Sequence, residues 1–402
     1  MRRLVGKSLL AAVLLASVLP AVPGHADART SGYIVVLADG FTASSVSSVA
    51  AEHATTVEHV YSSALHGYSG RMTAAAAARL ARDPRVVLVQ PDGVATATAQ
   101  TTPTGIDRVD TELSPTARID GTDQRVAVDV AVIDTGVDLD HPDLNVNTAG
   151  AKNCSTGRSA DDGNGHGTHV AGTIGALDNG VGVVGVAPGA RIWPVRVLNA
   201  QGSGSFSDII CGIDYVTAHA NEIEVANMSL GGSGSDSACG TNRDAMHEAI
   251  CRSVAAGVTY VVAAGNSASN SSSFVPAAYD EVITVSALAD FNGQPGGGAA
   301  ATCRTDVDDT FADFSNYGAD VDLIAPGVCI LSAWKGGGYN TISGTSMASP
   351  HVAGGAALYK ATHATASPAG VKSALQAAGT DSWNTGTDPD ATHERLLNVA
   401  TF

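Results

Sequence analysis

Residues 343–355 read Ser-Gly-Thr-Ser-Met-Ala-Ser-Pro-His-Val-Ala-Gly-Gly and surround one hydroxyl, that of Ser346, with small residues. A helical apolar pattern follows at Val352, Ala356 and Ala357, so Ser346 lies where a loop becomes a helix. The free N–H groups at a helix N-terminus favour negative charge, which suits a serine that attacks a carbonyl and creates an oxyanion. An ordinary helix cap has the same pattern and is commoner. The stretch alone therefore favours a cap, and a catalytic interpretation needs a base and an orienting group elsewhere.

The composition is that of a compact, acidic protein. Of the 402 residues only 15% are charged and 45 are glycine, which is typical of a folded chain with many tight loops. The net charge of −17 opposes binding to the phosphate backbone of a nucleic acid. We therefore expect no nucleic-acid partner.

The N-terminus has the pattern of a secretory signal peptide. Basic residues lie near its start, Leu9–Leu19 is an apolar run too short to span a membrane with ease, and small residues lead up to Ala28. No second long apolar run follows. We expect residues 1–28 to be removed on export, and the rest to be secreted without a membrane anchor.

All six cysteines lie in the part that would be exported. An even count in such a protein favours three disulfides, although six cysteines permit about fifteen pairings. Proximity in the sequence suggests Cys239–Cys251 and Cys303–Cys329, which leaves Cys154–Cys211. The spacings lack a Cys-x-x-Cys pair and match no common zinc pattern.

Residues 31–93 have the pattern of a small separate domain, and Val94–Pro103, rich in Ala and Thr, has that of a linker or processing site. The element order strand-helix-strand-strand-helix-strand predicts a ferredoxin-like α+β fold. The assigned strands are Tyr33–Leu37, Gly67–Met72 and Val86–Gln90, and the assigned helices are Ala43–His53 and Ala74–Arg82.

From Gly105 onward apolar strands alternate with helices, which predicts a parallel sheet covered on both faces, with its functional site at the carboxyl ends of the strands. The predicted strands are Val126–Ile133, Ile192–Leu198, Val225–Leu230, Thr259–Ala264, Val282–Leu288 and Val321–Ile324. The predicted helices are His166–Leu177, Ser207–Ala220, Arg243–Ala256, Thr345–Thr362 and Ala369–Ala378.

Three polar residues at strand ends or helix starts could complete a catalytic set with Ser346. Asp134 follows a strand, His166 starts a helix after a Gly-rich turn, and Asn266 ends a strand. An imidazole can act as a base near neutral pH, a carboxylate can orient it, and an amide can face an oxyanion. Taken singly, Asp134 and Asn266 are better explained as turn residues. His169 could pair with His166 on a metal, but no His-Glu-x-x-His arrangement is present, so we interpret His169 as structural.

Together these residues identify a resemblance: residues 126–398 resemble the subtilisin-like serine proteases, with a leaning toward secreted bacterial subtilisins and proteinase K-like enzymes. The resemblance implies a three-layer α/β/α domain with a mostly parallel central sheet. The matching blocks, in order, are Val132–Gly136, Asn164–Gly172, Asn227–Gly232, Ala263–Asn266 and Gly344–Gly354.

The resemblance implies a role for each site residue. Ser346 would be the nucleophile, His166 the general base and acid, Asp134 its orienting group, and Asn266 a donor of the oxyanion hole. Two strands would bind the backbone of the substrate through small residues. These are Ser229, Leu230 and Gly231 on one strand and Ala263, Ala264 and Gly265 on the other.

Calcium is the cofactor that the resemblance implies, bound through oxygen atoms. We expect a first site made by the side chains of Gln100, Asp143 and Asn179 and the carbonyls of Leu177, Val181 and Val183. A second, weaker site would use Asp322 with the carbonyls of Asp280 and Val282. The alternative at both places is an acidic loop without metal.

Residues 31–93 resemble the inhibitory prodomain of the same proteases, on the blocks Gly67–Met72 and Asp83–Asp92. We expect a signal peptide (residues 1–28), a prodomain (29–98) and a peptidase domain (99–402), with self-cleavage near Thr98–Ala99. The prodomain would act as an intramolecular inhibitor and chaperone of a monomeric enzyme.

The predicted function is that of a secreted serine endopeptidase that cleaves polypeptides. The predicted pocket floor, Ser269–Pro276, contains no acidic residue, so an apolar or aromatic preference is favoured over Lys or Arg. A dibasic-specific convertase, an esterase or transacylase, and a catalytically silent binding scaffold are the alternatives.

Overall fold

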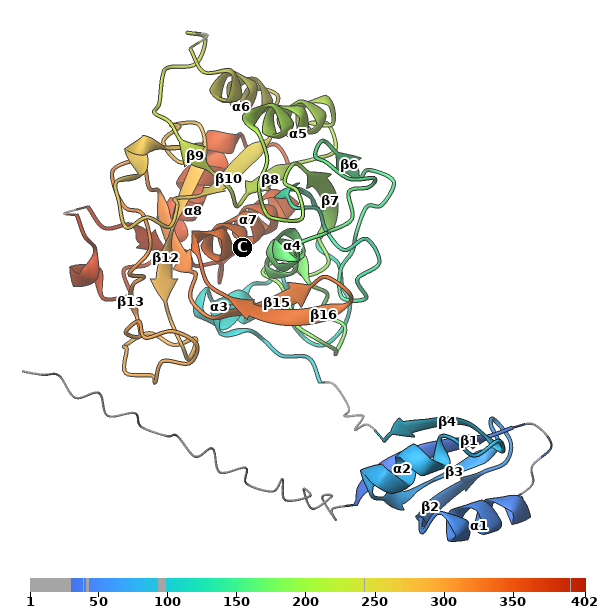
Figure 1. The fold of residues 1–402 in the computed structure, drawn as a ribbon. Helices are drawn as coiled ribbons and strands as arrows, with labels where there is room; N and C mark the ends of the chain where they lie inside the picture. Colours follow the sequence, from blue (N-terminus) through green and yellow to red (C-terminus); the bar gives the residue numbers. More distant parts are fainter. Residues whose placement is uncertain (1–29, 39, 41–42, 93–98, 242, 391) are drawn as a thin grey trace, which may run out of the picture. The chain divides into compact units, whose positions relative to one another are not determined.

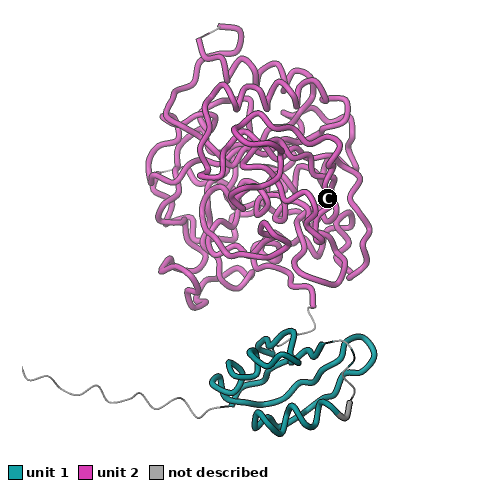
Figure 2. Tube along the Cα trace, turned by 45° about the vertical axis from the view of Figure 1, so that its right-hand side comes forward, with its two compact units in different colours: residues 1–97 teal, residues 98–402 magenta. Residues whose placement is uncertain are grey.

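A computed structural model describes residues 30–38, 40, 43–92, 99–241, 243–390 and 392–402. The expected signal peptide falls on residues outside these ranges, as does Thr98 at the expected cleavage site. The chain separates into two compact units, residues 1–97 and residues 98–402, which Figure 2 colours teal and magenta. None of the helices in the described ranges has the length and apolar character needed to cross a membrane.

The first unit is a four-stranded antiparallel sheet with two helices. The strands lie in the order β2-β3-β1-β4, and the element order along the chain is the predicted one. The core joins the sheet to both helices through buried Val35, Val49, Met72 and Leu80. The bounds are β1 Ser31–Leu37, α1 Ala43–Glu52, β2 Thr56–Tyr61, β3 Gly67–Met72, α2 Ala74–Leu80 and β4 Val86–Pro91. Strand β2 is the one strand of this unit without predicted bounds.

The second unit is built on a central sheet whose main path runs β17-β14-β12-β10-β8-β5-β7-β6. Every pairing along this path is parallel, while β13 adds to β12 in the antiparallel sense. The mostly parallel α/β architecture is therefore confirmed. The strands are β5 Asp129–Asp134, β6 Lys152–Asn153, β7 Arg191–Arg196, β8 Val225–Met228, β10 Thr259–Ala263, β12 Ile283–Ala289, β13 Thr310–Phe311, β14 Leu323–Pro326 and β17 Arg395–Leu396.

Helices cover both faces of this sheet (Figure 1). Strand β5 shows the division, because Val130 and Val132 enter one core while Ala131 and Ile133 enter the other. The first core contains residues of α4, α7 and α8, and the second contains residues of α5 and α6. The helices are α3 Thr104–Arg108, α4 His166–Gly175, α5 Phe206–Ala218, α6 Ala245–Ala255, α7 Thr345–Thr362 and α8 Pro368–Ala378.

Two small sheets lie outside the predicted pattern. Strands β15 (Ile330–Trp334) and β16 (Gly338–Ile342) form an antiparallel hairpin, and β9 (Gly232–Ser233) pairs with β11 (Phe274–Val275). The turn of the hairpin is held by Asp138, which accepts hydrogen bonds from the N–H groups of Gly336 and Gly337.

Three disulfides close the loops of the second unit. They are the pairs expected from proximity in the sequence: Cys154–Cys211, Cys239–Cys251 and Cys303–Cys329. No cysteine in the described ranges is free.

Candidate active site

Asp134 and His166 meet at the carboxyl edge of the central sheet. Asp134 is the last residue of β5, and His166 is the first residue of α4. Asp134 Oδ1 lies 2.7 Å from His166 Nδ1, and the carboxylate is fully buried. The N–H of Thr135 also donates to Oδ1, at 2.7 Å. The carboxylate therefore fixes the orientation of the imidazole and favours a proton on Nδ1.

The carboxylate also changes the basicity of the imidazole. Burial acts to lower the pKa of His166, but the charge of Asp134 and its hydrogen bond outweigh burial and raise the pKa above its ordinary value. A raised pKa makes the neutral ring a stronger base, while leaving it available at mildly alkaline pH.

A second buried acid, Asp162, shapes the loop that leads to His166. Its Oδ1 accepts from the N–H groups of Asn164 and Gly165, and its Oδ2 accepts from the N–H and hydroxyl of Thr168. One carboxylate thus joins the turn before α4 to the first turn of that helix. Asp162 was not predicted as a site residue, although an acid before a Gly-rich helix start is a recognisable capping signal.

The residues behind His166 complete its support. Gly165 has φ +116°, and a Cβ there would lie 2.3 Å from the ring of Trp334 in hairpin β15–β16, so this position requires glycine. His169 is fully buried, and its Nε2 lies 2.9 Å from the Ile330 carbonyl. Burial lowers the pKa of His169 to about 3, in agreement with a structural role.

Ser346 lies in the first turn of α7 and is held by Ser229. The Ser346 hydroxyl donates to the Ser229 carbonyl at 3.2 Å, and the Ser229 hydroxyl donates to the Ser346 carbonyl at 2.8 Å. The second bond is available because Pro350, four residues on, has no N–H to give to that carbonyl. Pro350 inside the helix therefore leaves the Ser346 carbonyl free to accept from Ser229.

Ser346 and His166 line neighbouring cavities that share Leu230 and Gly231. The described hydrogen bonds include none between the serine hydroxyl and the imidazole. Such bonds are often long or poorly aligned in an enzyme without substrate.

Asn266 is positioned by the residue that precedes Ser346. Its Oδ1 accepts from the N–H of Thr345 at 2.9 Å and from the Thr345 hydroxyl at 3.0 Å. A Cβ on Gly344 would lie 3.6 Å from Asn266 Nδ2 and 3.7 Å from the Ser346 nitrogen. Two N–H donors without an acceptor among the described residues thus flank one small space. Thr345, which orients the amide, was not predicted as a site residue.

The expected substrate-binding residues line the two cavities. Ser229 borders the cavity beside His166, and Leu230 and Gly231 border both. Ala263, Ala264 and Gly265 border the cavity beside Ser346. The structure therefore brings the two expected segments, one directly after β8 and one at the end of β10, to the cavities that His166 and Ser346 line.

The residues expected at the first calcium site converge. The Gln100 amide nitrogen lies 2.8 Å from the Leu177 carbonyl and 3.3 Å from that of Val183. Asp143 is fully buried and accepts from the Asn179 amide at 3.0 Å. Burial raises the pKa of the Asp143 carboxyl. A buried carboxylate beside several carbonyl and amide oxygens is the donor set that calcium prefers, so these residues fit the ion.

The structure adds two details to this region. The hydroxyl of Tyr339, from β16, lies 3.2 Å from Asp143 Oδ2 and was not foreseen. The Val181 N–H donates to Asn179, and the role of the Val181 carbonyl as a ligand stays a prediction.

The second expected calcium site needs correction, because Lys372 supplies its positive charge. The Lys372 ammonium lies 2.8 Å from Asp322 Oδ1, 2.9 Å from the Val282 carbonyl and 3.3 Å from the Asp280 carbonyl. These are the oxygens that were expected to bind the ion. An ammonium from α8 takes the place of the cation, so we do not propose a second calcium ion.

Comparison with known proteins gives a family match for each of the two units. A model described as the subtilase family matches residues 126–393, and one described as peptidase inhibitor I9 matches residues 32–97. An extracellular serine proteinase of Thermus sp. (strain Rt41A) is 40% identical over 366 residues, which cover 90% of this chain and 81% of that protein. Subtilisin NAT of Bacillus subtilis subsp. natto is 39% identical, over 75% of this chain and 72% of its own.

A solved structure supports the fold. The crystal structure of a cold adapted subtilisin-like serine proteinase matches with a TM-score of 0.55 and 35% sequence identity. The match covers 74% of this chain and 97% of that chain.

Replacing Lys372 should expose the oxygens around its ammonium. We expect Lys372→Met to lower the free energy of unfolding by about 1–3 kcal/mol, because Asp322 loses its partner while it is largely buried. Added calcium should restore part of this loss. Thermal unfolding in a Ser346→Ala background, with and without calcium, measures both effects. Lys335→Met, at an exposed lysine with one carbonyl contact, is the matched control and should change little. Full stability of Lys372→Met without added ions would contradict the assignment.

Proposed function

This chain belongs to the subtilase family of serine proteinases and carries a peptidase inhibitor I9 domain, and we propose that it hydrolyses peptide bonds through an acyl-enzyme on Ser346. The observation that carries this proposal is the 2.7 Å contact between buried Asp134 and His166, at the sheet edge where α7 presents Ser346. A silent binding scaffold is disfavoured, because all members of the catalytic set are present.

The proposed reaction uses this chain's side chains in two steps. His166 Nε2 takes the proton of the Ser346 hydroxyl as its oxygen attacks the scissile carbonyl, and Asp134 stabilises the resulting imidazolium. The imidazolium then gives that proton to the leaving amine, which departs from the acyl-enzyme. In the second step His166 takes a proton from water, the resulting hydroxide attacks the ester, and the proton returns to Ser346.

The oxyanion of each tetrahedral intermediate would lie between the Ser346 N–H and the Asn266 amide. Both donors are set before substrate arrives, the first by the start of α7 and the second by the bonds from Thr345 to Asn266 Oδ1. Preorganised donors stabilise the transition state without a reorganisation cost. The absence of a side chain at Gly344 leaves room for the oxygen.

The cavity beside Ser346 supports a preference for apolar or aromatic side chains. Its walls include Ala263, Ala264, Phe274 and Ala277, and none of the residues that line it is acidic. A Lys or Arg side chain would find no carboxylate there to offset the cost of burying its charge. This cavity therefore favours a broad-specificity endopeptidase over a dibasic convertase.

We propose that the enzyme is exported as a zymogen, with the domain limits expected from the sequence: 1–28, 29–98 and 99–402. The inhibitor-domain match ends at residue 97, next to the expected cleavage at Thr98–Ala99. The relative from Thermus is named as an extracellular proteinase, in keeping with secretion.

Calcium would have a structural role. Gln100, Asp143, Asn179 and the carbonyls of Leu177 and Val183 would hold it, with Val181 as a further expected ligand. A bound ion there would neutralise the buried Asp143. Independently of the ion, Thr101 bridges to Val183, so the chain start of the peptidase unit is tied to the loop after α4.

Removing the nucleophile is the direct test of the function. We expect the purified protein to hydrolyse casein and a serine-directed covalent inhibitor to label Ser346, and Ser346→Ala to lower turnover by about 10⁶-fold. Ser373→Ala, at an exposed serine of α8, is the matched control and should keep full activity.

The same preparations separate the alternatives. N-terminal sequencing should find the active protein beginning near residue 99 and the Ser346→Ala protein uncut at that point. Unchanged casein hydrolysis in Ser346→Ala would refute the proposal. Hydrolysis of esters alone would favour the esterase alternative, and absence of both labelling and hydrolysis would favour a scaffold.

The pH dependence should report the contact between Asp134 and His166. The base must be neutral, so kcat/KM should fall as the pH drops through the raised pKa of His166, with a midpoint above about 6.5. Asp134→Asn removes the charge that raises the pKa, so the midpoint should move to lower pH while kcat falls about 10⁴-fold. Asp140→Asn, at an exposed acid, is the control of equal charge. An unmoved midpoint in Asp134→Asn would count against the assignment.

Calcium should stabilise the protein through Asp143. At a concentration about 100 times its Kd the ion should add about 2.7 kcal/mol to the free energy of unfolding. Asp143→Asn removes the only carboxylate of the expected ligand set and should abolish most of this gain. Thermal unfolding of both proteins in a Ser346→Ala background, with calcium or a chelator, measures it. The control is Asp123→Asn. Asp123 pairs with Arg125 and lies outside the expected ligand set, so this variant should keep the calcium response. An equal calcium response in Asp143→Asn would place the ion elsewhere.

A further inference from the structure

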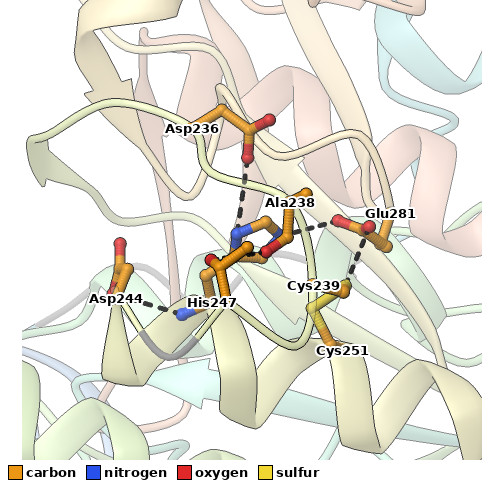
Figure 3. The surroundings of a disulfide bond; sticks show 8 residues. Asp236, Ala238, Cys239, Asp244, His247, Cys251 and Glu281 are labelled. Carbon is orange, nitrogen blue, oxygen red and sulfur yellow. Dashed lines mark hydrogen bonds and ion pairs between the residues drawn. A yellow bond between two sulfur atoms is a disulfide. The ribbon is translucent and has the colours of Figure 1, made fainter.

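The disulfide between Cys239 and Cys251 lies among ionisable side chains that play no part in the proposed reaction (Figure 3). Cys239 belongs to the loop between β9 and α6, and Cys251 lies on α6. His247 is one helical turn before Cys251 on the same face of α6, and Glu281 comes from the turn before β12. Three separate segments therefore bring two sulfurs, an imidazole and a carboxylate to one place.

The four side chains are close enough to share one ion. One ligand atom from each lies within 4.8 Å of the others. His247 Nε2 is 2.6 Å from a Glu281 oxygen, and the Cys239 sulfur is 2.9 Å from the other Glu281 oxygen. Neither of the other two disulfides in the described ranges belongs to such a group.

The imidazole is held as a metal-binding histidine usually is. It is 2% exposed and stacks on the ring of Tyr279 at 4.0 Å. Its Nδ1 lies 3.4 Å from Asp236 Oδ1, which leaves Nε2 directed at Glu281 and the sulfurs. A carboxylate on the far nitrogen orients the ligating nitrogen.

The oxidised cysteines make little chemical use of the side chains around them. A disulfide sulfur has no hydrogen to donate to the carboxylate beside it, whereas the thiol of reduced Cys239 would have one. Two thiolates, an imidazole nitrogen and a carboxylate oxygen form a four-ligand set of the kind that zinc binds in tetrahedral geometry. Asp236, Asp244 and Glu281 make the surroundings negative, which opposes free thiolates and favours a divalent cation.

We propose that the Cys239–Cys251 disulfide is the oxidised form of a zinc-type site, in which Cys239, His247, Cys251 and Glu281 bind a divalent cation after reduction. An external dithiol would supply two electrons and two protons to the disulfide and become a disulfide itself. Binding of the cation would then release the two thiol protons to solvent. Cys239 is exposed, so a thiolate can reach the bond.

The site would keep one wall of the cleft in place under reducing conditions. The segment that carries Cys239 begins at Gly231, which borders both cavities of the candidate active site. In the oxidised protein a covalent bond ties the end of this segment to α6. In the reduced protein the cation would tie the same two places together.

The test uses the full chain with Ser346→Ala, which prevents self-digestion, and Co²⁺ as a spectroscopic probe. A water-soluble phosphine reduces the protein under exclusion of air. The phosphine is itself oxidised to the phosphine oxide, whose oxygen atom comes from water. We expect one Co²⁺ per chain, with a thiolate-to-cobalt charge-transfer band and the intense bands of tetrahedral cobalt, displaced by one equivalent of Zn²⁺. The oxidised protein should show no such band.

Matched variants assign the ligands. Cys239→Ser with Cys251→Ser should lose the charge-transfer band, whereas Cys303→Ser with Cys329→Ser should keep it. Asp236→Asn should weaken Zn²⁺ binding by about 10–100-fold, because it orients His247. A band that persists without Cys239 and Cys251, or no band in the reduced parent, would overturn the proposal.

Alkylation of individual cysteines tests the proposal even where reduction causes loss of structure. In the reduced parent, Zn²⁺ should slow alkylation of Cys239 and Cys251 at least about tenfold, as read by mass spectrometry. Alkylation of Cys303 and Cys329 should be unaffected. If reduction unfolds the chain and Zn²⁺ protects neither Cys239 nor Cys251, the proposal is wrong. Absence of peptidase activity in the protein without any substitution would bear on the proposed function and not on this site.

Discussion

The carboxyl ends of parallel strands lie at one edge of their sheet. The candidate active site is assembled from residues that this constraint brings together. Asp134 ends β5, Ser229 directly follows β8, and Asn266 lies shortly after β10. Their neighbours in the sheet are fixed by the ladders β5–β8 and β8–β10. Residues that are far apart in the chain therefore reach the same edge, although no single segment shows that they should. The remaining components, His166 and Ser346, come from helices that start at the same edge.

The start of α7 shows how backbone chemistry prepares such a site. A proline inside the helix leaves one carbonyl without its usual donor, and that carbonyl belongs to Ser346 itself. The hydroxyl of Ser229 satisfies it, and Asn227 and Ser349 extend the same network at 2.9 and 2.7 Å. A buried carbonyl without a partner would cost about 1–3 kcal/mol, so Ser229 stabilises the helix start as well as bordering the cleft. Substrate binding and helix stability consequently share one residue.

Much of this arrangement could be predicted from the sequence, because it depends on local patterns. Apolar strands and helix starts are legible in a single segment, and α7 begins and ends at the predicted residues. The hairpin β15–β16 was missed, because its strands are short and each is defined by pairing with the other. Lys372 was missed for a related reason: its contacts with Asp280, Val282 and Asp322 lie 50 or more residues away in the chain. Spacing between cysteines alone also gave no sign of His247 and Glu281 around one disulfide.

The position of Lys372 has a consequence for how this protein depends on its surroundings. An ammonium attached to the chain has a high effective concentration at its binding oxygens, which dilution does not lower. A free ion occupies its site only in proportion to its supply, whereas the lysine is synthesised together with the oxygens that it neutralises. The positive charge at this site of the peptidase unit is therefore part of the polypeptide and is not taken up from the medium. The stability of the site consequently does not depend on the concentration of metal ions around the enzyme.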